Sequence, residues 1–260
     1  MAPKLANLRR KRILLTNDDG IDAPGMKVLQ RIARALSDDV WVVAPETEYS
    51  GASRSLTLTS PLRLRKITSR KFAVEGTPTD CVMMALSQVM GDKRPDLLLS
   101  GINRGANMAE DVTYSGTIGA AMEGTLVGVP SIALSQSFAN RKVMHWATAE
   151  QHAGDIIRRL VALGWPKDVL MNVNFPDVLP GEVKGVEVVR QGRRDLTALN
   201  IEQRIDAREK PYYWIGFRPT QGAPKAGTDL SATEEGRIAI TPLHLDLTEN
   251  KTLKQLKAAF

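Results

Sequence analysis

The fold is decided by the stretch Ile13-Leu14-Leu15-Thr16-Asn17-Asp18-Asp19-Gly20. Its short apolar run, residues 13–15, is typical of a strand buried on both faces, and Gly20 allows the chain to turn sharply. Apolar residues then recur at helical spacing from Gly25 to Leu36, which predicts a helix after the turn. This strand–turn–helix order predicts the beginning of an α/β fold.

Two adjacent carboxylates, Asp18 and Asp19, stand at the end of this first predicted strand. Like charges side by side repel each other and resist burial, so the pair indicates a compensating positive group, of which a bound cation is the simplest. The alternative is a solvated turn, because Asp and Gly are ordinary turn residues.

Further apolar runs predict buried strands at residues 40–44, 95–100, 129–134 and 169–173. Segments with helical spacing or helix-start signals lie between them, at residues 76–90, 118–126 and 145–163. Alternation of strands and helices predicts right-handed crossovers and a mostly parallel central sheet.

The remaining segments predict smaller elements around this core. Residues 56–59 and 62–65 alternate with period two and predict a bent or paired ribbon, and residues 72–74 predict a short strand. Strands are also predicted at 186–189, 212–217 and 238–241, with a polar arm from Leu196 to Lys210 and a short helix at residues 253–259. We therefore expect a basic leader (1–12), a core (13–180) and a C-terminal elaboration of the same domain (181–260).

The charge is distributed unevenly along the chain. The 35 basic and 29 acidic residues give a net charge of +6, but five of the basic residues lie in residues 1–12, which contain no acid. The rest of the chain has 30 basic against 29 acidic residues, which gives little electrostatic basis for binding nucleic acid. We expect the leader to be solvated and dispensable for turnover.

Cysteine usage and hydropathy limit the cellular compartments that we expect for this protein. No apolar run approaches the about 18 residues of a membrane span, and none follows the leader as in a signal peptide. Cys81 is the single cysteine, so an internal disulfide is excluded, which fits a cytoplasmic protein. We interpret Cys81 as a packing residue and Asp80 as a helix cap, because these are the commoner roles.

Oxygen-bearing side chains follow three of the predicted strands. Asp18 and Asp19 follow the first, Ser50 follows the second and Asn103 follows the third. Ligands bind beyond the carboxyl ends of strands in an open parallel sheet, and these oxygens suit Mg²⁺, Mn²⁺ or Ca²⁺. None of the three histidines lies in these loops, which disfavours a histidine-rich zinc site.

Two stretches of small polar residues, 50–53 and 115–117, supply hydroxyls and backbone amides able to cradle phosphate. The second stands at a predicted helix N-terminus, where the helix dipole attracts anions. Together with the metal site, these stretches indicate phosphoryl chemistry. A receiver domain of a signalling protein is set aside, because its phospho-accepting Asp at the end of the third strand is replaced here by Ser100.

Several motifs in order resemble those of SurE, the survival-protein nucleotidase family. They are NDDG (17–20), APETEYSGASRS (44–55), GTPTDC (76–81), SGINRGAN (100–107) and DVTYSGTIGAAMEG (111–124). VNFP (173–176) and TPLHLDLT (241–248) extend the resemblance over nearly the whole chain. One departure is Ala109, where the family pattern leads us to expect glycine.

The resemblance implies a Rossmann-like, three-layer α/β sandwich with a C-terminal β-rich oligomerisation arm. It implies divalent-metal-dependent hydrolysis of nucleoside 5′-monophosphates, often also 3′-monophosphates, by a 5′-nucleotidase type of phosphomonoester hydrolase. It places one metal ion per subunit on the four oxygen donors Asp18, Asp19, Ser50 and Asn103. It also implies a homodimer or homotetramer in which residues 196–217 and the last helix are exchanged.

The hypothesis from the sequence is metal-assisted attack of water on a phosphate ester. The residues expected to orient the phosphoryl group are Asn17, Gly51, Ser115, Gly116 and Thr117. Asp18 or Asp19 acting as base or as direct nucleophile stays open, and Arg104 fits a phosphate contact or a surface role equally. The rival functions are a non-catalytic nucleotide-binding or assembly protein and a nucleic-acid-binding protein that uses the leader.

Overall fold

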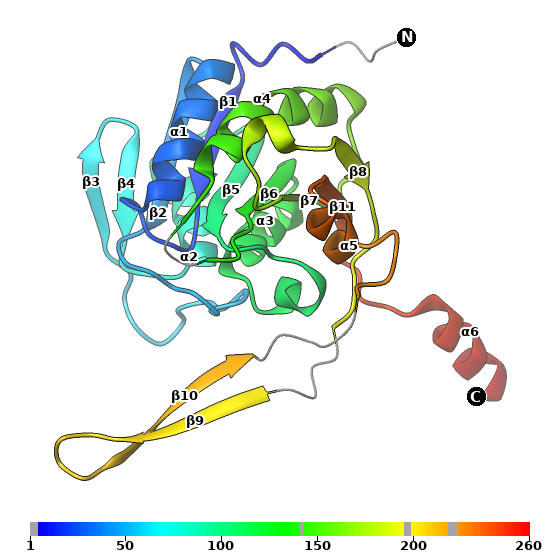
Figure 1. Ribbon diagram of the computed structural model, residues 1–260. Helices are drawn as coiled ribbons and strands as arrows, with labels where there is room; N and C mark the ends of the chain where they lie inside the picture. Colours follow the sequence, from blue (N-terminus) through cyan, green and yellow to red (C-terminus); the bar gives the residue numbers. More distant parts are fainter. Residues whose placement is uncertain (1–4, 141–142, 195–198, 218–222) are drawn as a thin grey trace.

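A nine-stranded sheet organises the described part of the chain, in the order β3-β4-β2-β1-β5-β6-β7-β11-β8. The structure is a computed structural model that describes residues 5–140, 143–194, 199–217 and 223–260 (Figure 1). The strands of the sheet are β1 (Arg12–Thr16), β2 (Asp39–Pro45), β3 (Leu64–Thr68), β4 (Lys71–Val74), β5 (Leu97–Arg104), β6 (Ser131–Gln136), β7 (Val169–Phe175), β8 (Val186–Val188) and β11 (Ile238–His244).

Helices cover both faces of this sheet. They are α1 (Pro24–Leu36), α2 (Pro78–Met84), α3 (Gly116–Leu126), α4 (Trp146–Leu163) and α5 (Asp229–Glu234), and a further helix, α6 (Asn250–Ala259), lies away from the sheet. The helix α2 continues into a π-helical turn (Ala85–Val89), and short 3₁₀ turns lie at Ala109–Thr113 and Pro180–Glu182. One core cluster joins α1 and α4 to one face, and a second joins α2 and α3 to the other (Figure 1). The predicted α/β fold with three layers and a mostly parallel sheet is confirmed.

The first strand lies inside the sheet because its side chains are apolar on both faces. Ile13, Leu14 and Leu15 are fully buried, and β1 pairs in parallel with both β2 and β5. Gly20 adopts φ +101°, a left-handed conformation that suits glycine, and so turns the chain into α1. The stretch that opened the sequence therefore forms the centre of the molecule.

Two expectations about the smaller elements need correction. Residues 56–59 form no strand, since the backbone of this segment is held instead by bonds such as Thr57 N to Asp80 Oδ1 (3.1 Å). The segment expected to be a polar arm contains a strand, β9 (Leu199–Ile205), which pairs with β10 (Pro211–Phe217) as an antiparallel hairpin. The sequence reasoning also missed α5. Leu196, where the arm was expected to begin, lies outside the described residues.

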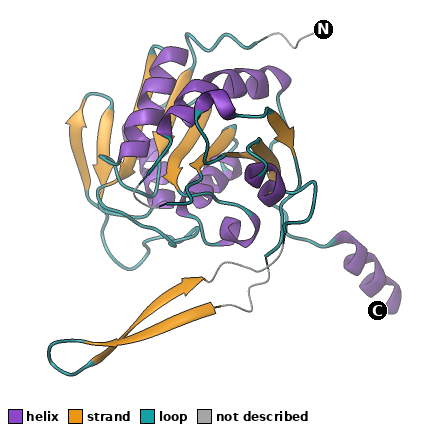
Figure 2. Ribbon diagram, viewed as in Figure 1, coloured by secondary structure: helices purple, strands orange, loops and turns teal. Residues whose placement is uncertain are grey.

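The C-terminal elaboration is divided between the sheet and two projections. β11 pairs antiparallel with β7, and β8 pairs parallel with β11, so these strands extend the central sheet. The hairpin β9–β10 and the helix α6 project from the body (Figure 2). Within the described residues, no helix has the length and apolar character needed to cross a bilayer.

The leader is more firmly attached than the sequence indicated. Leu8 is 3% exposed and packs in the core cluster of α1, and Ala6 N donates to Arg158 O (3.2 Å). Arg12 is the first residue of β1, and its guanidinium donates to Asp39 (2.9 Å). Arg9, Arg10 and Lys11 are exposed as expected, but a wholly solvated leader is wrong, because an apolar side chain anchors the segment.

Replacing the anchor should therefore cost more than removing a neighbouring charge. We expect Leu8→Ala to lower the free energy of unfolding by about 2 kcal/mol, because buried methyl groups are lost and a cavity is left. The matched control Arg10→Ala should change it by less than about 0.5 kcal/mol, because this side chain is exposed. Urea denaturation of the two variants measures both values, and equal values would contradict the anchoring role of Leu8.

Candidate metal and phosphate site

The sheet order places β2, β1 and β5 side by side, and Thr16, the last residue of β1, pairs with Ser100 of β5. Asp18, Asp19 and Ser50 lie beyond the carboxyl ends of β1 and β2, whereas Asn103, which was expected in the loop after the third strand, lies within β5, because that strand extends to Arg104. The loops that follow these strands leave the sheet at its lower edge in Figure 1. The loops after β1 and β2 and the carboxyl end of β5 therefore meet at one edge of the sheet.

Asp18 is the most deeply placed carboxylate of the site, with 4% of its surface exposed. Its Oδ1 accepts a hydrogen bond from the Thr117 hydroxyl, in the first turn of α3. A Cβ on Gly116 would lie 2.9 Å from the Asp18 Cβ, so only glycine lets α3 approach this closely. The backbone oxygen of Asp18 accepts from Tyr49 N (2.8 Å), which brings in the loop after β2.

Asp19 is half-buried beside it and connects the pair to the third loop. Its Oδ2 accepts a hydrogen bond from Arg104 N at 3.0 Å, and Arg104 directly follows the predicted ligand Asn103. The Asn103 amide is oriented by its Nδ2, which donates to Gly105 O at 2.8 Å. Asp18, Asp19 and the Asn103 loop are thus joined by the main chain at the end of β5.

Ser50 lies at the exposed tip of the loop after β2. Its hydroxyl donates to Glu48 Oε1 at 2.6 Å, and the next residue, Gly51, has φ +77° with nothing within 4 Å of its Cβ position. Glu48 was missed by the sequence reasoning, because a lone acid in a polar loop gives no signal of its position. It adds a third negative charge near Asp18 and Asp19 and raises the pKa of both.

The predicted phosphate-binding side chains are mostly engaged within the protein. Ser115 is the N-cap of α3 and accepts from Ile118 N (3.1 Å), and Thr117 donates to Asp18. Asn17 is fully buried and donates to Gly20 O (2.8 Å), while its Oδ1 has no partner within the protein. The Thr117 amide also bonds to Asp18, so the groups at this end of α3 that remain suited to an anion are the Gly116 amide and the helix dipole.

Comparison with known proteins agrees with this arrangement. The family model described as "Survival protein SurE" matches residues 13–198. The chain belongs to the SurE family. A "5'-nucleotidase SurE" of Parvibaculum lavamentivorans is 60% identical over 250 residues, which cover 95% of this chain and 90% of that protein. The "5'-nucleotidase SurE" of Caulobacter vibrioides NA1000 is 60% identical over 249 residues, 95% of each chain.

A solved SurE structure shows the same fold. The crystal structure of the SurE protein from Aquifex aeolicus superimposes with a TM-score of 0.83 and is 41% identical in sequence. The match covers 95% of this chain and 99% of that one. The resemblance inferred from the motifs is therefore confirmed, both in sequence and in fold.

At Ala109, where the SurE pattern leads us to expect glycine, the backbone adopts a conformation that favours glycine. Ala109 adopts φ +50°, in the left-handed region that glycine enters freely and alanine enters at a cost of about 1 kcal/mol. Its N–H donates to Asp229 Oδ2 (2.9 Å) and its oxygen accepts from Gln191 Nε2 (2.7 Å). Asp229, fully buried at the start of α5, also accepts from Gly192 N (2.8 Å). The C-terminal part of the chain thus holds the loop after β5 in shape.

The donor set fits a divalent cation. Burial is the largest cause that raises the pKa of Asp18, and burial followed by the charge of Asp18 raises the pKa of Asp19 to about 6. Among the described residues no group of three or more His, Cys, Asp or Glu side chains gathers to hold a metal, so further ligands would have to be neutral oxygens. A hard cation such as Mg²⁺ or Mn²⁺ accepts such a mixture of carboxylate, hydroxyl and amide oxygens.

The raised pKa of Asp19 predicts how the stability of the metal-free protein depends on pH. Asp19 keeps its proton up to about pH 6 when folded, whereas its ordinary pKa is 3.8, so the folded protein binds more protons between these values. We therefore expect the contribution of Asp19 to the free energy of unfolding to fall as pH rises from 4 to 6.5 in the presence of a chelator, whereas carboxylates of lowered pKa, such as Asp39, contribute in the opposite direction. Asp19→Asn should lose part of this dependence, measured by urea denaturation, and an unchanged pH profile would contradict the assignment.

Proposed function

We propose that this chain is a divalent-metal-dependent phosphatase that hydrolyses nucleoside 5′-monophosphates, and also 3′-monophosphates, to nucleoside and phosphate. The observation that carries the proposal is the meeting of the Asp18–Asp19 pair with the N-terminus of α3. The 5′-nucleotidase names of relatives at 60% identity support the substrate class. A single buried cysteine, Cys81, agrees with a reducing compartment such as the cytoplasm.

The residues that would hold the cation are Asp18, Asp19, Ser50 and Asn103. A cation held there supplies charge neutralisation on the phosphate and a water of lowered pKa. The Thr117 hydroxyl fixes one oxygen of Asp18, and Arg104 N fixes one oxygen of Asp19, so neither carboxylate needs to reorient during turnover.

The N-terminus of α3, through the Gly116 amide and the helix dipole, orients the phosphoryl group next to the acid pair, while Thr117 bonds to Asp18 and holds that acid beside it. Gly51, at the tip of the loop that carries Ser50, offers a further exposed amide. Asn17 braces the turn from within and acts through the position of Asp18. Asp19 is more exposed than Asp18, which makes it the more accessible of the two carboxylates to a water molecule and so the better placed as a base.

Replacing one carboxylate tests this proposal. We expect Asp18→Asn to lower kcat for AMP at least about 1,000-fold with Mg²⁺ or Mn²⁺, because a charged ligand and its orientation are both lost. Inorganic phosphate release is measured across a matrix of nucleotides and metals, and circular dichroism verifies the fold of the variant. Full activity in Asp18→Asn would remove this residue from the site. If the wild type binds nucleotides but releases no phosphate with any metal, the rival non-catalytic binding function holds.

The proposal includes a homodimer or homotetramer that exchanges the C-terminal arm. One face of the hairpin β9–β10 carries Ile201, Ile205, Tyr213 and Ile215, which are all exposed by more than half. The last helix α6 likewise exposes Leu256, and Phe260, which follows the helix, is exposed as well. A two-stranded hairpin alone is marginal in water, and exposed apolar faces of this kind mark association surfaces.

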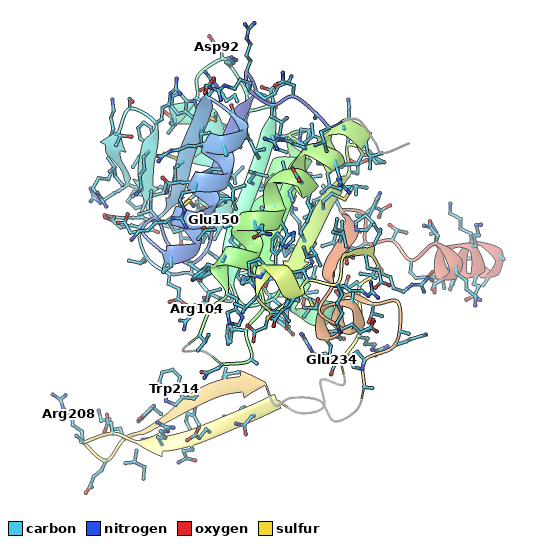
Figure 3. The ribbon with its side chains drawn as sticks, turned by 45° about the horizontal axis from the view of Figure 1, so that its top comes forward. Asp92, Arg104, Glu150, Arg208, Trp214 and Glu234 are labelled. Carbon is cyan, nitrogen blue, oxygen red and sulfur yellow. The ribbon has the colours of Figure 1, made fainter. Side chains whose placement is uncertain are left out.

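The hairpin face provides the test of assembly. Ile201 and Ile215 are directly paired across the strands, so Ile215→Asp places a charge in the middle of the apolar face. We expect this variant to shift the mass measured by light scattering towards the monomer, while Trp214→Ser, on the opposite face, has a smaller effect. Figure 3 shows Trp214 on the hairpin and Arg104 at the edge of the body. A wild-type monomer would contradict the proposed assembly.

A further inference from the structure

The loop that carries Ser50 has a tip without packing of its own. Ser50 and Gly51 are exposed, and nothing lies within 4 Å of the Gly51 Cβ position. Asp18, by contrast, stands directly after a buried strand, and Asn103 lies within β5. The position of Ser50 relative to these residues must therefore be set by contacts elsewhere in the loop.

On its N-terminal side the loop is fixed by the main chain. Tyr49 N donates to Asp18 O (2.8 Å), and Pro45 O accepts from Ile21 N (2.8 Å). On its C-terminal side the loop is bonded to the turn that precedes α3. Ser53 N donates to Tyr114 O (2.9 Å), and the Ser53 hydroxyl donates to Thr113 O (2.8 Å). The chain thus returns from the tip against the helix that binds phosphate in the proposed function.

The approach to α3 is close enough to depend on a glycine. A Cβ on Gly119 would lie 2.3 Å from the backbone oxygen of Ser53, which no side chain tolerates without displacing the loop. Ser53 itself adopts φ +53°, a conformation that needs surrounding contacts to persist. These contacts hold the loop in one position against α3. A small displacement of Ser53 would therefore move the tip that carries Ser50.

The next residue, Arg54, holds the loop in this position through an ion pair with Glu123. Its Nη2 and Nε donate to Glu123 Oε2 at 2.9 and 3.2 Å. The Glu123 side chain is 8% exposed, whereas that of Arg54 is 35% exposed. Leaving a buried carboxylate without its partner costs free energy. Glu123 therefore holds Arg54 in one place on the side of α3. A second buried carboxylate, Asp80, accepts from Thr57 Oγ1 at 2.6 Å a few residues further on.

We infer that Arg54 is a positioning residue, which through its ion pair with Glu123 holds Ser50 in place as a metal ligand. This inference rests on the proposed function, since it takes Ser50 as a ligand. Arg54 touches neither Asp18 nor Asp19 in the described contacts; it acts on the loop, and the loop carries the hydroxyl. The pair also couples the two parts of the site, because the helix that carries Glu123 begins at Gly116 and Thr117.

The test is Mn²⁺ binding to the metal-free full-length protein, measured by isothermal titration calorimetry. We expect Arg54→Ala to weaken Mn²⁺ binding about 10- to 100-fold, the range found when groups that orient metal ligands are removed. In a Ser50→Ala background the same change should weaken binding less than about twofold, because the hydroxyl it positions is absent. The control Arg31→Ala removes an arginine from an exposed ion pair with Glu150 on the other face of the sheet and should leave binding unchanged.

Removing both charges of the Arg54–Glu123 pair distinguishes a purely structural role of Arg54 from a positioning role. Arg54→Ala leaves Glu123 buried without a partner, whereas the double variant Arg54→Ala/Glu123→Gln carries no buried charge and should regain thermal stability. If Arg54 positions Ser50, Mn²⁺ binding by the double variant stays weak although its Tm recovers. Recovery of Tm and Mn²⁺ binding together overturns the inference.

The remaining outcomes separate the inference from the proposed function. Wild-type Mn²⁺ binding by Arg54→Ala, or an equal loss with and without Ser50, overturns the positioning role and leaves the phosphatase proposal standing. Wild-type binding by Ser50→Ala withdraws Ser50 from the ligand set and overturns the inference with it. Phosphate release by Asp18→Asn tests the proposed function independently of all these variants.

Discussion

The repulsion between Asp18 and Asp19 is the constraint on which the rest of the site depends. A buried strand delivers both carboxylates to the edge of the sheet, where burial opposes their ionisation. Two other segments donate hydrogen bonds to these carboxylates, through the Thr117 hydroxyl and Arg104 N, and Tyr49 N holds the backbone oxygen of Asp18. These donors fix the acids without neutralising them, and the charge that remains is what a divalent cation would compensate.

The segments around the acid pair differ in how they are held. Asp18 and Asn103 inherit their positions from central strands, which cannot shift without disturbing the sheet. The tip of the loop after β2 has no packing of its own, so the position of this loop depends on the contacts of Ser53 and Arg54 with α3. The loop after β5 depends on the buried carboxylate of Asp229, which holds Ala109 in a left-handed conformation. Side chains far from the chemistry therefore decide the shape of the site.

The sequence predicted the layered architecture well, because buried parallel strands and amphipathic helices have periodicities that a single sequence displays. It predicted Asp80 correctly as a helix cap, since Thr77 and Asp80 form a capping box, and it predicted Cys81 as buried. It failed where the pattern of a segment is overridden by its neighbours. The alternation in residues 56–59 suggested a strand, yet Asp80 holds this segment outside the sheet.

The sequence by itself determined the fold class and the family, because these follow from local periodicity and from motifs that stand in order along the chain, and the same motifs predict the four oxygen donors. Only the tertiary structure decided that Leu8 anchors the leader, that Glu48 stands beside Ser50 and that Arg54 pairs with Glu123. Such contacts join residues whose separation along the chain bears no relation to their distance in space. A buried ion pair between a loop and a helix 69 residues apart leaves no periodic trace in the sequence, because its geometry exists only once the sheet has brought both segments together.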